Sequence, residues 1–284
     1  MTTVVPSFYE AFVCKAERCR HSCCRGWEID VDEDSAALYR SLPGPLGEDL
    51  RAALREDEEG FHFRLTAEGR CPFLEQSGLC RLIRELGEDA LCDICALHPR
   101  FFETVGDYEL AGLGLSCEAV CALLLAEPGP LRFICGERRE LRLKDLTLLF
   151  GWQAPPQALH FVPRPEAERA AAILDRLSRT EPIDEAWPRE LAALHAALPE
   201  VLAQAQARKA DDPQALDRIF QYILYRQLDR AEDFGLPALV EYARDSADFV
   251  FLSAVHSGDP AEALRRWSEQ IEYSTENVDI LLRR

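Results

Sequence analysis

The sequence predicts a mainly α-helical protein. We expect a cysteine-rich metal-binding N-terminal half with short helices and a small β-hairpin, then an antiparallel α-helical C-terminal half. Two observations lead to this prediction. All eleven cysteines lie between Cys14 and Cys135, and apolar residues recur at i, i+3, i+4 and i+7 in one segment after another beyond residue 165. We therefore expect a metal domain at 1–150, a proline-rich linker at 151–165 and a helical domain at 166–284.

The composition narrows the class of protein and the compartment. Hydrophobic residues make up 48% of the 284 residues and charged residues 29%, so the chain can bury a core. It has no run of about 18 apolar residues and no signal-peptide pattern at its start, which predicts a cytoplasmic protein that does not enter a membrane. The net charge of −18 disfavours nucleic acid as a partner. The charge either serves only to keep the protein in solution or also attracts a basic or lysine-bearing partner.

The N-terminal half contains short elements. Alternating apolar residues predict a strand at 61–65 and a hairpin whose strands, 101–105 and 108–113, are joined at Gly106-Asp107. Helices are expected at 32–42, 79–86, 89–97 and 116–126. The first has an acidic first turn, the second stops near Gly87, and Ser116 is the expected N-cap of the fourth.

Longer helices are expected after the linker. The prolines of the linker prevent a continuous helix there. Beyond it, helical periodicity predicts helices at 166–179, 189–207, 212–231, 236–256 and 260–273. The apolar stripe on the third of these is expected to be a core face, formed by Ile219, Phe220, Ile223, Leu224 and Leu228.

The cysteines fall into four groups. They are Cys14-x4-Cys19-x3-Cys23-Cys24, Cys71 with Cys80, Cys92-x2-Cys95, and Cys117. A soft metal requires several thiolates that converge on one point, and short loops supply two of them at little cost in chain entropy. The cytosol keeps thiols reduced, so these groups predict metal ligation rather than disulfide bonds. Cys121, Cys135 and His98 are expected to be structural, although Cys121 and His98 could also ligate.

The identity of the metal stays open on spacing alone. Zinc sites usually have two regular pairs of ligands, whereas iron–sulfur clusters accept four thiolates at varied spacing. The irregular spacing and the adjacent pair Cys23-Cys24, taken together with the family resemblance described below, favour a 4Fe-4S cluster, with zinc as the alternative.

Several segments resemble the flagellin lysine-N-methylase family. The run from Cys14 to Ile29 is similar to the start of that family, and Cys71–Cys80, Cys95–Arg100 and Leu113–Cys117 are similar to its next three signatures. Two C-terminal segments, 220–226 and 267–277, also resemble family motifs. The first region looks like the broader zinc- or iron-chelating cysteine-cluster proteins as well.

The resemblance implies a ligand set and an activity. The family's eight cysteines fall on Cys14, Cys19, Cys23, Cys24, Cys71, Cys80, Cys95 and Cys117, with Cys92 as an extra cysteine. The implied activity is methyl transfer from S-adenosylmethionine to a lysine of flagellin or a similar surface protein, with an iron–sulfur cluster required. The chain departs from the family at Cys117, which is followed directly by Glu118, and in its shorter length.

The site for S-adenosylmethionine and the catalytic base are less defined by the sequence. Gly112-Leu113-Gly114 is interpreted as strand packing rather than as a nucleotide-binding loop. One hypothesis assigns Arg100 to the methionine carboxylate of the cofactor. Glu28, Asp30, Tyr39 and Glu118 follow cysteine groups and could act on the lysine proton, but nothing ranks them. The competing interpretations are a metal-chelating protein without methyltransferase activity and a redox module.

Overall fold

The computed structural model describes residues 1–207 and 213–283. Its contacts divide the chain into two compact units. We call Val13–Arg100 the cysteine unit, and Met1–Phe12 together with Phe101–Arg284 the helical unit. The division thus falls at residues 12–13 and 100–101 rather than near residue 150. The reason is that the expected hairpin and the segments after it join a sheet that packs with the C-terminal helices.

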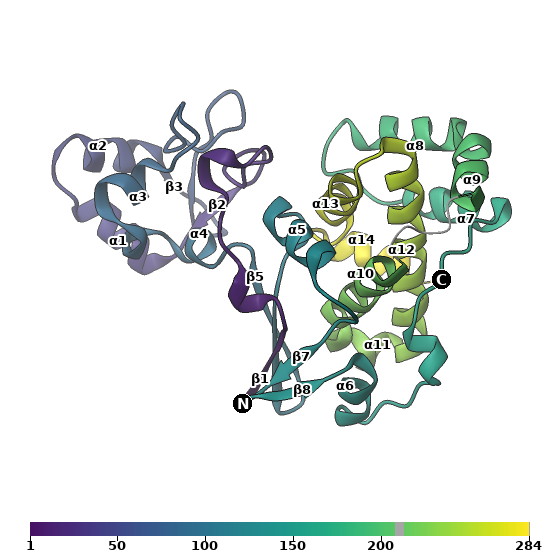
Figure 1. Ribbon diagram of the computed structural model, residues 1–284. Coiled ribbons are helices and arrows are strands. Elements are labelled where there is room, and N and C mark those ends of the chain that lie inside the picture. The colour runs from purple at the N-terminus through teal and green to yellow at the C-terminus, as the bar shows by residue number, and fades with distance from the viewer. Residues whose placement is uncertain (208–212, 284) are drawn as a thin grey trace. The chain divides into compact units, whose positions relative to one another are not determined.

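The cysteine unit combines a small sheet with short helices (Figure 1). Its antiparallel sheet has the order β2-β4-β3. The elements in chain order are the 3-10 helix Ala16–Arg18, β2 (Ile29–Val31), α1 (Glu33–Ser41), α2 (Gly44–Ala53), β3 (Leu54–Glu56), β4 (Phe61–Phe63), α3 (Arg81–Leu86), the 3-10 helix Glu88–Ala90 and α4 (Asp93–Leu97).

Local chemistry explains where these helices begin and end. Asp32 caps α1 by accepting a hydrogen bond from the Ser35 amide, at 2.8 Å. Gly87 follows α3 with a φ of +91°, which favours glycine. The predicted helices at 32–42 and 79–86 are therefore confirmed within two residues. The helix expected at 89–97 is instead a 3-10 turn followed by α4, and α2 was not predicted.

The helical unit contains a five-stranded sheet in the order β5-β6-β1-β7-β8. Its strands are β1 (Thr2–Pro6), β5 (Arg100–Val105), β6 (Tyr108–Leu113), β7 (Phe133–Cys135) and β8 (Arg139–Leu141). The predicted hairpin is confirmed as β5 and β6. The N-terminal strand β1 was not expected, and it pairs in parallel with β6 and antiparallel with β7.

Helices form most of the helical unit, which confirms a mainly α-helical chain with some β structure. They are α5 (Glu118–Ala126), α6 (Leu143–Leu149), α7 (Ala167–Leu177), α8 (Trp187–Ala196), α9 (Leu198–Ala207), α10 (Pro213–Arg226), α11 (Ala231–Phe234), α12 (Leu236–Ser257), α13 (Pro260–Ile271) and α14 (Thr275–Leu282); the 3-10 helices are Tyr9–Ala11, Pro156–Leu159 and Leu228–Arg230.

Three predicted helix boundaries require correction. The helix expected at 189–207 is two helices, α8 and α9, and Pro199 lies in the first turn of the second. The N-cap of α5 is Cys117 rather than Ser116, so this cysteine lies at the N-terminal end of the helix. The helix expected at 212–231 is divided into α10, a 3-10 turn and α11; its first residue, Asp212, lies outside the described residues.

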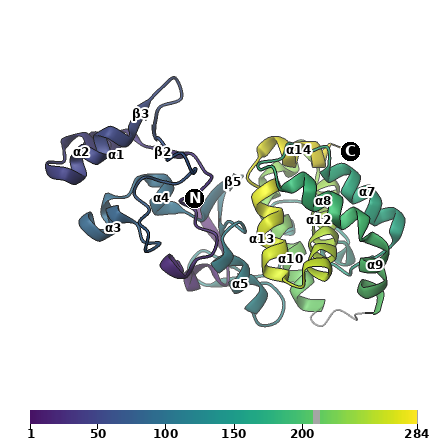
Figure 2. The same cartoon turned by 90° about the horizontal axis from the view of Figure 1, so that it is seen from above.

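The long helix α12 organises the core of the helical unit. It packs against α10, α13, α7 and α9, and Figure 2 shows it between α13 on one side and α7–α9 on the other. The predicted apolar stripe of α10 is buried in this core. Gly112 is packed in β6 as the sequence indicated, because a Cβ placed there would lie 2.3 Å from Cζ of Phe101. Across residues 1–207 and 213–283, no helix has both the length and the apolar character to cross a membrane.

Candidate metal centre

Backbone pairing brings the first two cysteine groups of the cysteine unit together. The amide of Cys71 donates to the carbonyl of Cys24 at 2.9 Å, and the amide of Gly26 donates to the carbonyl of Gly69 at 2.8 Å. Gly69 closes the intervening turn with a φ of +67°. Two cysteines that are 47 positions apart in the sequence are therefore fixed side by side by main-chain hydrogen bonds.

A tight loop then adds Cys80. The amide of Leu74 donates to the carbonyl of Cys71 at 3.1 Å, and Leu74 forms an isolated antiparallel bridge with Cys80. The turn between them contains Gly78, where an added Cβ would lie 3.2 Å from the Cα of Glu17. This close approach packs the loop that carries Cys14 and Cys19 against the loop that precedes Cys80.

The third group is placed by α1 and α4. Cys92 is the N-cap residue of α4, and Cys95 lies in its first turn. The amide of Asp93 donates to Oδ2 of Asp32 at 2.9 Å, and the hydroxyl of Tyr39 donates to the carbonyl of Ala90 at 2.7 Å. Both bonds anchor the start of α4 to α1, so the position of this pair depends on the capping residue of α1.

Five thiols of these groups interact electrostatically, and we call them the thiol cluster: Cys24, Cys71, Cys80, Cys92 and Cys95. Cys71 and Cys92 belong to the apolar core of the cysteine unit, and the other three pack against it. Phe63, Phe73 and Tyr39 supply stacked or edge-on rings in the same core. Three separate segments thus hold the cluster, in which Cys71 and Cys92 are buried and the other three cysteines are half-buried.

The thiols perturb one another's acidity. A hydrogen bond from the Cys23 thiol lowers the pKa of Cys24 to about 7, against the opposing effect of burial. Burial raises the pKa of Cys71 to about 12, and the negative charges of Cys24 and Cys80 act in the same direction. The cysteine unit therefore contains one thiol whose pKa is lowered and another whose pKa is raised, and a nearby cation would favour ionisation of the second.

Cys92 and Cys95 form a second such pair. The Cys95 thiol donates a hydrogen bond to Cys92, which lowers the pKa of Cys92 and raises that of Cys95. Burial and the charges of Cys92, Cys24 and Cys71 raise the pKa of Cys95 further. Burial and the charges of Cys92 and Cys95 raise the pKa of Tyr39 as well. A bound cation would stabilise these crowded thiolates.

The structure distributes the predicted ligands unequally. Cys24, Cys71, Cys80 and Cys95 lie in the thiol cluster, whereas Cys14 and Cys23 are exposed and Cys19 is half-buried with its sulfur 3.3 Å from the carbonyl oxygen of His21. Cys117 belongs to the helical unit. Cys121 and Cys135 are buried there, as expected of structural cysteines, and the Cys121 thiol donates to the carbonyl of Leu115 at 2.9 Å.

Cys92 is the cysteine that sequence reasoning set aside and that the structure brings into the thiol cluster. Its exposed fraction is 0%. The spacing Cys92-x2-Cys95 carried the signal, because two cysteines three positions apart at the start of a helix can face the same point. The resemblance to the family obscured it, since the family pattern has no cysteine at this position.

The thiol cluster offers sulfur donors, the type that a soft metal prefers. The eleven cysteines are all reduced, with no disulfide bond. In the part of the chain that the structure describes, no three His, Cys, Asp or Glu side chains are arranged closely enough to hold a metal ion. The case for a metal therefore rests on the number of thiols, their burial and their mutual interaction.

The other predicted site residues lie outside the thiol cluster. Arg100 is the half-buried first residue of β5. Burial lowers the pKa of His98, so this side chain is neutral near pH 7. Glu28 and Asp30 are exposed, and Glu118 is buried in the first turn of α5. Tyr39 contacts the cluster, but its hydroxyl is already bonded to Ala90.

Asp32 provides a first test of how the centre is positioned. Burial acts to raise its pKa, but hydrogen bonds from Asp93 and Ser35 outweigh burial and lower it. A lowered pKa means that ionised Asp32 stabilises the fold above its unfolded pKa and that this contribution disappears as the pH falls. We expect Asp32→Ala to lower the free energy of unfolding by roughly 1–2 kcal/mol at pH 7.

The effect of Asp32→Ala should shrink below pH 3.8, the ordinary pKa of aspartate. Urea denaturation at neutral and acidic pH measures both effects. Asp34→Ala is the matched control, because Asp34 is an exposed aspartate in the same first turn. Equal losses in the two variants would contradict the anchoring role of Asp32.

Comparison with known proteins identifies relatives of this chain. The chain is 29% identical over 134 residues to a protein named lysine-N-methylase from Salmonella typhimurium and to one of the same name from Salmonella choleraesuis. It is 28% identical over 145 residues to the flagellar biosynthetic protein FliU of Salmonella muenchen. The resemblance to the flagellin lysine-N-methylase family is confirmed.

The extent of these matches is partial. The alignments with the lysine-N-methylases include 45% of this chain and 33% of theirs, so the chain spans about a third of the length of these relatives. The alignment with FliU includes 49% of this chain and 85% of FliU. No protein-family model matches the chain, and no solved structure does so.

Proposed function

We propose that the chain is an iron–sulfur protein that uses S-adenosylmethionine to methylate lysine side chains of flagellin or a similar surface protein in the cytoplasm. The observation that supports this proposal is the thiol cluster, formed by three separate segments in a chain that is similar to lysine-N-methylases. The cytoplasm suits such a cluster because thiols stay reduced there.

The residues that would hold the metal follow from the thiol cluster. A 4Fe-4S cluster takes four thiolates, and Cys24, Cys71, Cys80, Cys92 and Cys95 offer five candidates in one core. Cys14, Cys19, Cys23 and Cys117 remain candidates through the family resemblance. If only three of these thiolates held the iron–sulfur cluster, the fourth iron would keep an open position for the amino and carboxylate groups of the cofactor.

The protein part of the reaction must deliver a neutral lysine. A lysine at its reference pKa is neutral in only about one part in a thousand near pH 7, so the site must desolvate it or remove its proton. The net charge of −18 attracts a lysine-bearing surface over long range. The need for a neutral lysine and the attraction of basic surfaces are both consistent with an acidic enzyme whose substrate is a protein.

Two measurements on one preparation test the proposal. The protein is purified without oxygen, and its iron, zinc and acid-labile sulfide are counted per chain. The same chain is then co-expressed with a flagellin, whose lysines are examined for methyl groups by mass spectrometry. Iron with equimolar sulfide and methylated flagellin are expected, and a Cys71→Ser variant is the negative control.

The outcomes separate the proposal from the alternative, a zinc- or iron-chelating protein without methyltransferase activity. That alternative draws on one observation: the thiol cluster lies entirely within the cysteine unit and needs no second substrate site. Zinc without sulfide would support it and overturn the iron–sulfur centre. Iron and sulfide with unmodified flagellin would overturn the choice of substrate but leave the centre intact.

A further inference from the structure

A buried ion pair in the helical unit joins α10 to α13. Nε of Arg226 lies 3.0 Å from Oε1 of Glu272, whose other oxygen accepts a hydrogen bond of 2.7 Å from Ser268. The exposed fractions of the two charged side chains are 11% and 0%. The guanidinium carbon of Arg226 lies 4.3 Å from the centre of the Phe101 ring. We therefore interpret this pair as a structural link rather than as a ligand site.

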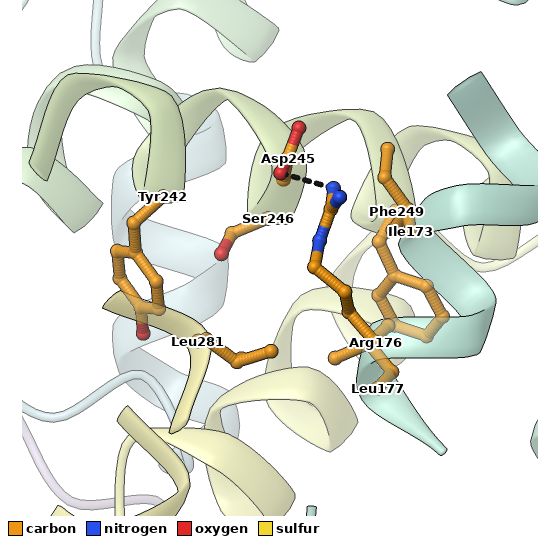
Figure 3. A pocket seen from close by; sticks show the side chains of 8 residues that line it. All are labelled: Ile173, Arg176, Leu177, Tyr242, Asp245, Ser246, Phe249 and Leu281. Carbon is orange, nitrogen blue, oxygen red and sulfur yellow. Dashed lines mark hydrogen bonds and ion pairs between the residues drawn. The ribbon is translucent and has the colours of Figure 1, made fainter. Parts of the chain in front are cut away.

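The small pocket between α7, α12 and α14 is also structural (Figure 3). Its volume is about 10 Å³, roughly the space of one water molecule. Arg176 and Asp245 form an ion pair in its lining, and Arg169 also donates to Asp245, at 2.7 Å. These bonds tie α7 to α12 and leave no room for a ligand.

The cysteine unit contains a larger groove, which we call the α2–α3 groove. Its volume of about 410 Å³ falls within the range of roughly 300–1,000 Å³ that is typical of ligand sites. Most of its lining is apolar and comes from the connection between α1 and α2, the start of α2 and the end of α3. The apolar residues are Leu42, Pro43, Pro45, Leu46 and Leu86.

The wall formed by the connection between α1 and α2 is held in place by the fold. Nη1 of Arg51 donates to the carbonyl of Leu42 at 2.7 Å. Gly47 allows this connection to pack against α2, because a Cβ at Gly47 would lie 1.9 Å from the carbonyl oxygen of Leu42. Pro43 and Pro45 restrict the backbone further. The groove is therefore preformed, and a ligand would not have to order this wall when it binds.

The charged side chains at the groove carry an excess of negative charge. Arg81 and Glu85 belong to the lining. Arg81 donates to Oε1 of Glu85 at 2.7 Å and to Oδ2 of Asp49 at 2.6 Å. With one positive and two negative charges, the three side chains have a net charge of −1. The side chains of Glu85 and Asp49 are 43% and 56% exposed, so both carboxylates are accessible to a further cation.

The groove shares α3 with the thiol cluster. Cys80 is the N-cap residue of α3, and Arg81 is the first residue of the helix. The amide of Arg81 donates to the carbonyl of Phe73 at 2.9 Å. Leu82 is buried in the core that contains the thiol cluster, whereas Leu86, at the end of the same helix, lines the groove. One short helix therefore fixes the groove relative to the thiol cluster.

We infer that the α2–α3 groove binds a lysine-bearing segment of the protein substrate. In this arrangement the methylene groups of the lysine lie against the leucines and prolines, and its ammonium group donates to Oε2 of Glu85. An apolar wall beside a carboxylate suits lysine, because its stem is apolar and its end is charged. This inference rests on the proposed function and makes it more specific, since it names residues that hold the substrate.

Binding of monomeric flagellin to the metal-loaded full chain tests the inference. Biolayer interferometry without S-adenosylmethionine measures binding independently of methyl transfer. Glu85→Lys places a like charge beside the incoming lysine and should weaken binding roughly tenfold or more. Glu48→Lys is the matched control, because it makes the same change of net charge at an exposed residue of α2 outside the lining. This control should retain most of the affinity.

A second pair of variants tests the apolar wall. Leu86→Ala removes three carbon atoms from the lining and should weaken binding roughly fivefold or more. Ile83→Ala removes the same number of atoms from an exposed position on α3 outside the lining, so it should bind as the unmodified chain does. Should Leu86→Ala not fold, as judged by circular dichroism, Glu85→Lys decides the question, since residue 85 is exposed.

The outcomes distinguish this inference from the proposed function. If flagellin binds and is methylated while both variants match their controls, the groove is overturned and the proposed function stands. If Glu85→Lys loses binding but the unmodified chain does not methylate flagellin, the groove is supported and the methyl transfer is overturned. Flagellin with acetylated lysines that binds as tightly as unmodified flagellin would overturn lysine as the occupant. Absence of flagellin binding by the unmodified chain would overturn the groove as well.

Discussion

Cys71→Ser is expected to remove the metal from the protein. Cys71 is 7% exposed and interacts with the thiols of Cys24 and Cys80. Loss of a residue that only supports a metal ligand weakens binding about 10–100-fold, and loss of a ligand itself should exceed this range. We therefore expect iron and sulfide per chain to fall below roughly a tenth of their normal content. Metal analysis after anaerobic purification measures the change.

Two further variants make this prediction specific. Cys135→Ser is the control, because Cys135 is equally buried, at 8%, but lies in the helical unit. Cys92→Ser distinguishes a ligand set that includes Cys92 from the set that the family resemblance implies. A loss of metal on changing Cys92 would place Cys92 among the ligands, whereas the family set predicts no loss. Retention of full metal content by both Cys71→Ser and Cys92→Ser would contradict a metal centre in the thiol cluster.

The metal should also stabilise the cysteine unit. Metal binding contributes to folding when the ligands converge only in the folded state. The thiol cluster meets this condition, because Cys24 and Cys71 are joined through backbone pairing that exists only in the fold. For this reason, the loss of metal and the loss of structure have to be measured separately in each variant, by metal content and by circular dichroism.

Local sequence signals made the helices predictable, whereas elements that depend on long-range pairing were harder to predict. Asp32 and Gly87 mark the ends of α1 and α3 through chemistry that acts within a few residues. Strand β1 has no such signal, because Val4 becomes part of a sheet only by pairing with Leu110 and Cys135. The same pairing draws residues 101–150 into the helical unit, which is why the predicted domain boundary did not coincide with the compact units.

The same distinction between local signals and long-range pairing applies to the candidate site. Clustered cysteines predicted a thiol-rich centre, but only backbone hydrogen bonds show that Cys24 and Cys71 are neighbours. The Arg226–Glu272 pair joins residues 46 positions apart. Each residue lies in a motif noted from the sequence, yet no periodicity relates α10 to α13. Pairs of this kind depend on tertiary packing and are therefore invisible to a search along the chain.

Arg226→Leu is expected to produce the largest loss of stability in the helical unit. It leaves the carboxylate of Glu272 buried without its counter-charge, and breaking a buried pair in this way costs about 3–5 kcal/mol. Urea denaturation followed by tryptophan fluorescence measures the loss, because Trp152, Trp187 and Trp267 lie in this unit. Arg179→Ala removes the exposed pair with Asp175 and should cost less than about 1 kcal/mol.

The pH dependence of the stability shows whether ionised Glu272 stabilises or destabilises the fold. Burial raises the pKa of Glu272, and Arg226 opposes that rise. A carboxyl with a raised folded pKa destabilises the fold when it is ionised, so the penalty grows as the pH rises above its unfolded pKa and is relieved as the pH falls. Removing Arg226 removes the opposing charge and should extend this dependence to higher pH.

The charge of Arg226 also acts to lower the pKa of Glu103 and of Asp229. Assigning the changed pH dependence to Glu272 therefore requires a second substitution. Adding Glu272→Gln to Arg226→Leu removes the buried charge and should recover much of the lost stability, because replacing both partners of a buried pair is often close to neutral. It should also flatten the dependence on pH. A double variant as unstable as Arg226→Leu, with the same pH profile, would show that the loss arises from packing around Phe101 rather than from the isolated carboxylate.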